Sequence, residues 1–254
     1  MPAYVSLASN KTGIAKLYLE HSAKTSAKCL DAVDYFVLLT KQMADYLQIK
    51  KPFCVMEGIS TKDSYLKLPD ARITDSEKKI VFYSGTLHKK FGVMNLLRAF
   101  ETIGDKDYVL QLCGVGDCEK EIERLAEQDK RIQFLGRVAR NEVLELQKKA
   151  TVLVNPRQNN EEFTKYSFPS KNLEYLSSGI PLVAYKLDGI PDEYDSYILY
   201  VEDDSIESLA RRITEVCEMD SDERVTVGKK AKEFVLTEKN QICQTRKILD
   251  LIHK

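Results

Sequence analysis

Short apolar runs alternate with amphipathic segments along most of the chain, beginning at Ile80. Short apolar runs are typical of buried strands, and apolar residues that recur every three or four positions are typical of helices. Strands that alternate with helices at short intervals form right-handed βαβ units, which assemble into an open parallel sheet covered by helices on both faces. We therefore predict an α/β domain over residues 80–254. Strands are expected at 80–84, 108–113, 132–135, 151–155, 181–185 and 197–201, and helices at 93–103, 120–127, 141–149, 206–219, 222–235 and 240–252.

The chain before Ser60 carries fewer elements. Its pattern predicts helices and strands in alternation, at 14–30, 35–39, 40–47 and 53–56. These elements are too few to enclose their own apolar residues, so we predict an incomplete second α/β domain at residues 1–59 with exposed apolar surface. A contiguous patch of this kind marks an interface or a tendency to aggregate. The segment 60–79 is rich in Lys, Asp and Ser and is interpreted as a linker.

Composition excludes several classes of protein. The 254 residues are 43% hydrophobic and 30% charged with a net charge of −1, as expected for a soluble globular protein whose main partner is not nucleic acid. The apolar runs are too short to cross a membrane, and the N-terminus lacks the basic-then-apolar order of a signal peptide. Six scattered cysteines without a CxxC pair, and only three histidines, indicate neither a zinc site nor a disulfide framework. We expect a cytoplasmic protein with at most peripheral contact at the inner face of the membrane.

The loop 156–170 is the first candidate for a ligand site. Ligands of open parallel sheets bind at the carboxyl ends of the strands, and this loop follows one of them. It is long and polar, it carries Arg157 and Tyr166, and it has little hydrophobic content to explain its length.

The helix that follows this loop is the second candidate. Ser167 is expected to cap it and Pro169 to occupy its first turn, while Gly179 closes it. The backbone amides of 170–172, together with Lys171, then form a site for phosphate. Glu174, one turn further on, is placed to accept hydrogen bonds from sugar hydroxyls. The alternative is an ordinary capped helix before a buried strand.

Two further loops lie at the same edge of the predicted sheet. The loop SGTLHKKFG after the first strand would bring backbone amides, Lys89 and Lys90 close to a diphosphate, although glycine-containing turns also occur for packing alone. Gly114-Val115-Gly116 is not a dinucleotide fingerprint, because Glu119 occupies the third glycine position. His88 at the rim is more often a surface residue than a catalyst.

Four segments carry a resemblance to a known family: YSGTLHKKFGVMNLLRAF, LCGVGDCEKEI, RIQFLGRVARNEVLELQKKATVLVNPR and EFTKYSFPSKNLEYLSSGIPLVA. In this order they resemble the Rossmann-like, nucleotide-sugar-binding half of a GT-B glycosyltransferase of family 4. Members of this family build capsular polysaccharides and exopolysaccharides in bacteria. The resemblance covers residues 80–254, while 14–59 is similar to the end of the family's N-terminal, acceptor-binding domain.

The resemblance implies a role for each site residue. Glu174 matches the family glutamate that binds ribose, and a second family glutamate falls on Tyr166. The family's usual Arg and Lys after the first strand align with Thr86 and Phe91, so we expect Arg157 and Lys171 to replace them as catalytic cations at the diphosphate. The residues expected to contact the donor are Gly85, Thr86, Gly114, Arg137, Val138, Tyr166, Ser170 and Glu174. Of these, Arg137 and Val138 are expected to lie near the base. No metal and no cofactor are expected.

Two functions remain open at this point. The first is a retaining, metal-independent hexosyltransferase that takes sugar from a nucleotide-diphosphate sugar and passes it to a glycan or lipid-linked acceptor. The second is a non-catalytic nucleotide-sugar-binding subunit or fragment that needs a complementary chain or self-association. A nucleotide-sugar epimerase is disfavoured, because such enzymes place acids and histidines in the cleft that the sequence does not offer.

Overall fold

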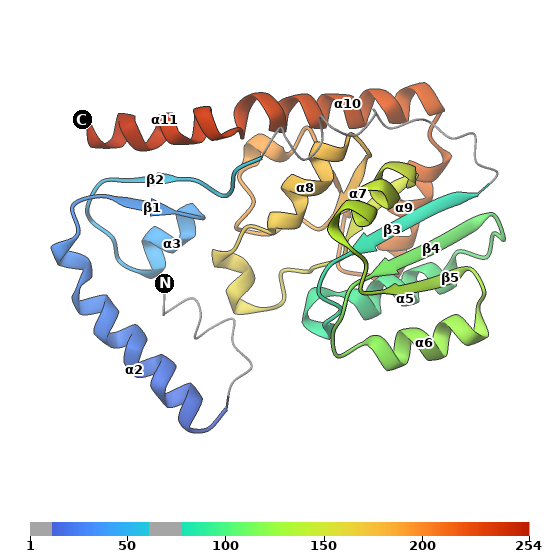
Figure 1. Cartoon of the computed structure of the whole chain (residues 1–254), viewed down its shortest axis with the longest axis horizontal. Helices are drawn as coiled ribbons and strands as arrows, with labels where there is room; N and C mark the ends of the chain where they lie inside the picture. The colour runs from blue at the N-terminus through green and yellow to red at the C-terminus, as the bar shows by residue number, and fades with distance from the viewer. Residues whose placement is uncertain (1–11, 61–77, 254) are drawn as a thin grey trace.

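The computed structural model describes residues 12–60 and 78–253, and its larger part is the predicted α/β domain (Figure 1). The central sheet has six parallel strands in the order β5-β4-β3-β6-β7-β8. The chain adds β4 and β5 on one side of β3 and then crosses to add β6, β7 and β8 on the other. The point between β3 and β6 is therefore a topological switch, where ligands of open sheets bind. The strands are Lys79–Ser84 (β3), Tyr108–Cys113 (β4), Ile132–Gly136 (β5), Val152–Asn155 (β6), Leu182–Ala184 (β7) and Leu199–Tyr200 (β8).

Helices cover both faces of this sheet. On one face α5 packs against α9, and on the other α8 packs against α7 and α10. The two central strands are apolar on both faces, which is why Phe82 and Leu153 are fully buried between the two helical layers. The helices are Val93–Thr102 (α5), Glu119–Gln128 (α6), Arg140–Lys149 (α7), Ser170–Ser178 (α8), Ile206–Glu218 (α9) and Ser221–Glu238 (α10), so each prediction is confirmed with shifted ends.

The beginning of α8 corrects one prediction. Ser167 does not cap the helix: Pro169 holds the cap position, and the Ser167 hydroxyl is buried without a hydrogen-bond partner in the described part of the chain. The amide of Asn172 is also not available to a ligand, because it donates to the carbonyl of Pro169 at 2.8 Å. The amides that remain candidates for phosphate are those of Ser170 and Lys171.

The loop before α8 corrects a second prediction. It contains a short 3-10 helix, Glu162–Tyr166 (η3), in which Phe163 and Thr164 are buried. The Phe163 ring meets the Phe91 ring edge-on at 6.3 Å between centroids. The loop therefore has a hydrophobic anchor that its polar composition hides.

The N-terminal unit, residues 12–60, is a small structure of its own. Two parallel strands pair in it, and its core is limited to Phe36, Leu38, Met43 and Ala44. The unit's first helix buries none of its residues. Its elements are Ile14–Lys28 (α2), Leu30–Ala32 (η1), Phe36–Leu38 (β1), Lys41–Tyr46 (α3) and Phe53–Val55 (β2), and of the predicted linker 60–79 the part 61–77 lies outside the described residues.

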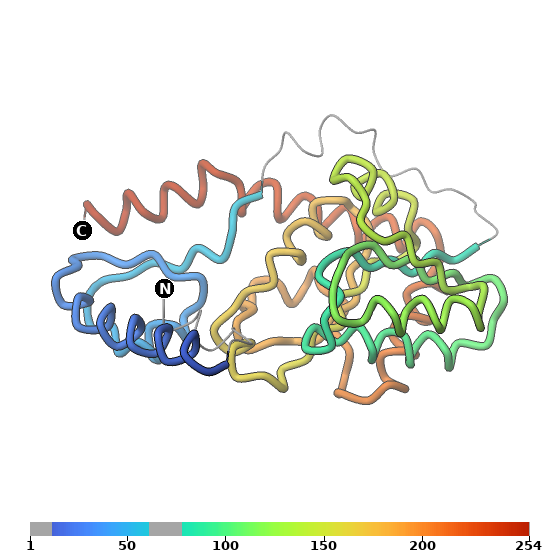
Figure 2. The backbone as a smooth tube through the Cα atoms, turned by 60° about the horizontal axis from the view of Figure 1, so that its bottom comes forward, coloured from blue at the N-terminus to red at the C-terminus, as the bar shows by residue number. Residues whose placement is uncertain are grey.

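The last helix, Gln241–Ile252 (α11), joins this unit to the α/β domain. Figures 1 and 2 show α11 leaving the end of α10 and running alongside β2. The Gln244 side-chain amide donates to the carbonyl of Gly58 at 2.8 Å, and the amide of Ser60 donates to the carbonyl of Lys239 at 2.8 Å. A buried ion pair of 2.6 Å joins Lys239 to Glu57, which also accepts from the hydroxyl of Tyr194 at 2.7 Å.

Apolar side chains on α2 are exposed, as the sequence predicts. Ile14 is 87%, Leu17 65% and Tyr18 72% exposed. We expect the purified chain to self-associate, with an apparent mass in light scattering that rises with concentration, because such a patch favours contact with another surface.

The double variant Leu17→Lys/Tyr18→Lys should suppress this self-association without lowering the unfolding temperature, since neither residue is buried. Val225→Lys, on an exposed site of α10, is the matched control and should leave the association unchanged. A parent chain that stays monomeric at all concentrations would contradict the prediction.

Candidate functional site

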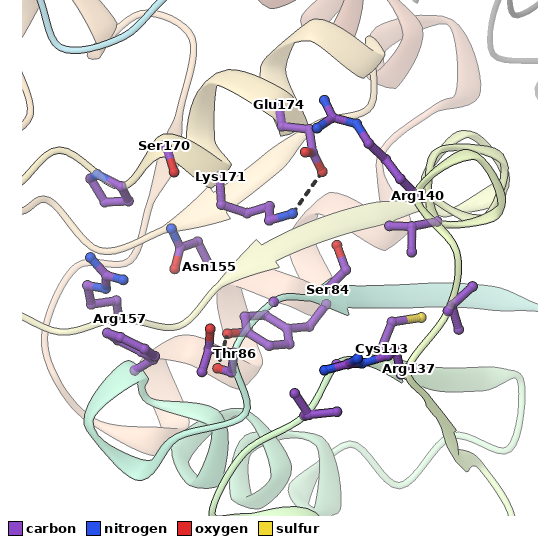
Figure 3. Close-up of a pocket in the computed structure, with 18 of the residues that line it drawn as sticks. Ser84, Thr86, Cys113, Arg137, Arg140, Asn155, Arg157, Ser170, Lys171 and Glu174 are labelled. Carbon is purple, nitrogen blue, oxygen red and sulfur yellow. Dashed lines mark hydrogen bonds and ion pairs between the residues drawn. The ribbon is translucent and has the colours of Figure 1, made fainter. Parts of the chain in front are cut away.

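A cavity of about 660 Å³ opens at the carboxyl ends of the central strands (Figure 3). It lies at the switch point between β3 and β6, and the first turns of α7 and α8 form part of its wall. The predicted site residues that line it are Gly85 and Thr86 after β3, Gly114 after β4, Arg137 and Val138 after β5, Arg157 after β6, and Ser170, Lys171 and Glu174 on α8.

The backbone turns after β3 and β4 form a tightly joined floor. The amide of Gly85 donates to the carbonyl of Cys113 at 3.0 Å, and the amide of Gly114 donates to the carbonyl of Gly136 at 2.8 Å. Gly114 has a φ of +143°, and a Cβ there would lie 1.8 Å from the carbonyl oxygen of Gly85. Glycine is therefore required at this position for the two turns to approach each other.

Side chains from two helices donate hydrogen bonds to Glu174. Lys171, one turn earlier on α8, donates to its Oε1 atom at 2.9 Å, and Gln147 from α7 donates to the same atom at 2.7 Å. The Lys171 and Glu174 side chains are 30% and 21% exposed, so both still reach the cavity. Figure 3 also shows the side chain of Arg140 extending toward Glu174.

Arg157 is oriented by aromatic rings. Its guanidinium carbon lies 4.3 Å from the ring centroid of Phe91 and 5.8 Å from that of Phe163. A cation stacked on such faces is attracted by the ring quadrupole and keeps its charge directed along the cavity wall. This explains how an arginine from the loop after β6 is fixed in place.

The charge of the cavity favours an anion. Among the described residues that line it, the cationic side chains are Arg137, Arg140, Arg157 and Lys171, against the single carboxylate of Glu174. Such a group of fixed positive charges, together with the start of α8, is suited to a diphosphate. Burial raises the pKa of the Cys113 thiol at the cavity floor to about 11, so it is a neutral thiol and not a nucleophilic thiolate near neutral pH.

Several candidates lie outside the cavity. Tyr166 is not among the lining residues: η3 turns its ring toward Tyr46 in the N-terminal unit, with 4.5 Å between the ring centroids. Lys89 and Lys90 are not lining residues either, and the amine of Lys90 lies 5.4 Å from the centroid of the Phe91 ring. His88 lies 3.3 Å from Asp117 at the rim.

Arg140 and Asn155 are among the lining residues that were not predicted from the sequence, and neither was the supporting residue Gln147. Arg140 begins α7, and its position at the first helical turn after β5 was the available signal. Asn155 ends β6, and its amide donates to Asn172 at 2.6 Å. Gln147 left no signal, because a glutamine within a polar helix resembles any surface residue.

Comparison with known proteins adds a family and a fold. The family model described as glycosyl transferases group 1 matches residues 67–234. The Escherichia coli (strain K12) protein named "Putative colanic acid biosynthesis glycosyltransferase WcaL" is 26% identical over 147 residues, which cover 56% of this chain and 36% of that protein.

Solved structures agree with this family in fold. TarM of S. aureus, crystallised with UDP among its ligands, superimposes with a TM-score of 0.73 at 15% identity, over 92% of this chain and 47% of that one. HepE of Anabaena in complex with UDP gives a TM-score of 0.67 at 16% identity, over 87% and 64%. These likenesses show the GT-B type of α/β fold. The matched part of this chain spans about half the length of TarM and less than half the length of WcaL.

No helix among residues 12–60 and 78–253 has both the length and the apolar content needed to span a bilayer.

Proposed function

Because this chain belongs to the glycosyl transferases group 1 family, we propose that it binds a nucleotide-diphosphate sugar in the cavity between β3 and β6. In this proposal it transfers the sugar to a glycan or lipid-linked acceptor in bacterial cell-surface polysaccharide synthesis. The observation that carries the proposal is the set of four cationic side chains facing one carboxylate at the switch point of the sheet. The structures of TarM and HepE contain UDP, so uracil is the first base to test.

The proposed chemistry rests on charge stabilisation. Arg157, Lys171 and the first amides of α8 bind the diphosphate, and their positive charge stabilises the negative charge that develops as the diphosphate leaves. Glu174 accepts hydrogen bonds from the ribose hydroxyls, and the turn at Arg137 lies beside the base. In the same proposal the sugar is transferred with retention at its anomeric carbon, without a metal ion and without a covalent nucleophile from the protein, as in glycosyltransferase family 4.

A second candidate function is a donor-binding module that does not turn over by itself. The N-terminal unit favours it, because its sheet has two strands among the residues that the structure describes, and α2 exposes apolar side chains. An acceptor-binding domain that is incomplete cannot position the second substrate, and such positioning lowers the barrier by several kcal/mol. A complementary chain, or a second copy of this chain, would supply the missing part.

Turnover distinguishes the two candidates. The purified chain is incubated with UDP-glucose, UDP-N-acetylglucosamine and GDP-mannose, and the released nucleoside diphosphate is measured. Release above the background of a Lys171→Ala variant supports the enzyme. Binding of nucleotide without release supports the module, and the absence of both binding and release contradicts the proposed function.

We expect Glu174→Gln to weaken nucleotide binding by roughly 1.5–3 kcal/mol, the range for a hydrogen bond to a charged group. The unfolding temperature should change little, because glutamine keeps an oxygen that accepts from Gln147, and a partly exposed ion pair within one helix contributes about 1 kcal/mol or less. Calorimetric titration with UDP and a thermal melt measure the two effects separately.

Glu121→Gln is the matched control. Glu121 forms the same kind of pair one helical turn apart, with Arg124 on α6, and it does not line the cavity. It should leave nucleotide affinity unchanged. Equal affinity in Glu174→Gln and the parent, with a lower unfolding temperature, would assign Glu174 a structural role only.

A further inference from the structure

Gln147 lies behind Glu174 and is wholly buried in α7. Its side-chain nitrogen Nε2 is 2.7 Å from Oε1 of Glu174 and 3.3 Å from the hydroxyl of Ser84. An ionised carboxylate can only accept hydrogen bonds, so the amide group of Gln147 must present its nitrogen to Glu174. Gln147 does not line the cavity, so it acts on a ligand through the two lining residues that it contacts, closely through Glu174 and more distantly through Ser84.

Fold stability does not explain a glutamine at this position. Among the residues that the structure describes, the Oε1 atom of Gln147 has no hydrogen-bond partner. A buried carbonyl left unpaired is destabilising, whereas an apolar side chain of the same length would fill the space without that cost. The hydrogen bond to Glu174 is therefore the feature that distinguishes glutamine from methionine here.

We propose that Gln147 is a positioning residue for donor binding, fixing the Glu174 carboxylate in the orientation that receives the ribose. The proposal rests on the proposed function. Lys171 and Gln147 approach the same oxygen of Glu174 from different helices, so together they define the rotation of the carboxylate. Without Gln147, the orientation of the carboxylate depends on flexible cationic side chains such as Lys171, and its geometry is less well set before the ligand arrives.

The test is the discrimination between a ribose and a 2′-deoxyribose ligand. UDP and GDP are each compared with their 2′-deoxy forms by calorimetric titration, in the parent and in Gln147→Met. The parent should prefer the ribose form of the nucleotide that it binds. In Gln147→Met this preference should fall about tenfold, the effect of a hydrogen bond to a charged group, while affinity for the 2′-deoxy form stays near that of the parent.

Gln244→Met provides a matched control. Gln244 is equally buried, its Nε2 atom donates to the carbonyl of Gly58, and its Oε1 atom has no partner among the described residues, but it lies on α11 away from the cavity. A structural effect of losing a buried glutamine should be shared by both variants in a thermal melt. Only Gln147→Met should change the ribose preference. If Gln147→Met does not fold, Gln147→Asn, which keeps the amide but is one methylene shorter, takes its place.

The outcomes distinguish failure of the proposed function from failure of the role assigned to Gln147. A parent that binds none of UDP, GDP, ADP and dTDP contradicts the proposed function, and the role of Gln147 fails with it. A parent that prefers the ribose form while Gln147→Met retains the full preference overturns the role of Gln147 and leaves the proposed function standing. Equal loss of the preference in Gln147→Met and Gln244→Met also overturns it.

Discussion

Lys239→Met should lower the free energy of unfolding by about 3–5 kcal/mol, the range for breaking a buried ion pair by removing one partner. The Lys239 and Glu57 side chains are each 1% exposed and lie 2.6 Å apart. Lys239 also pairs with Glu193. Without the lysine, the carboxylate of Glu57 stays buried with the hydroxyl of Tyr194 as its remaining described donor of a side-chain hydrogen bond. Chemical denaturation of the parent and the variant measures the difference.

The matched control is Lys79→Met. Lys79 pairs with Glu218 at the surface, where the two side chains are 29% and 51% exposed, so its loss should change the free energy of unfolding by only about 0.2–1 kcal/mol. The double variant Glu57→Leu/Lys239→Met should regain much of the loss, because no charge then remains buried. Equal effects of Lys239→Met and Lys79→Met would show that the buried pair does not hold the N-terminal unit to α10.

The ion pair between Glu57 and Lys239 also makes the stability of the folded chain depend on pH. Burial alone would raise the pKa of Glu57, but hydrogen bonds from Lys239 and Tyr194 and the charge of Lys239 outweigh it and hold this pKa below its usual range. A lowered pKa in the folded state means that the contribution is present above the unfolded-state value of about 4.3 and is lost as pH falls through the folded-state value. Unfolding temperatures measured from pH 7 to pH 3 should therefore fall more steeply for the parent than for the double variant.

Arg157→Ala and Lys171→Ala should each weaken the binding of a nucleoside diphosphate by roughly 1.5–3 kcal/mol and leave the affinity for the bare nucleoside almost unchanged. Both side chains line the cavity, and both are expected to act on phosphate charge. Calorimetric titration with UDP and uridine gives the two losses, and their ratio is the quantity that matters. Arg124→Ala, which removes a cation from the exposed face of α6, is the control and should affect neither ligand.

The opposite result is informative. If uridine and UDP lose affinity together, Arg157 and Lys171 shape the cavity and do not bind the diphosphate. The backbone amides of the loop after β3, with Lys89 and Lys90, would then be the next candidates, although both lysines lie outside the lining residues.

The sheet could be predicted from the sequence because each strand is a local apolar run. The pairs that hold the site together could not, since they join residues that are distant in the chain. Gln147 reaches Glu174 from another helix, and Glu57 contacts Lys239, which lies far from it along the chain. No spacing or composition records such contacts.

Two predictions from local residue preferences were wrong because the tertiary structure places these residues differently. Ser167 is a good capping residue, yet Pro169 takes the cap position and the serine hydroxyl is buried. Tyr166 falls in a loop beside the cavity, but the 3-10 turn anchored by Phe163 directs its ring to Tyr46. The sequence shows that a loop is long, and only the structure shows which of its side chains turn inward.

The most direct test of the account is a calorimetric titration of the purified chain with UDP, GDP, ADP and dTDP, repeated with the double variant Arg157→Ala/Lys171→Ala. At least one nucleoside diphosphate should bind the parent with one site per chain, and the double variant, though folded, should lose this binding. The proposed function predicts this result. It would be contradicted if none of the four binds, or if the double variant binds as tightly as the parent.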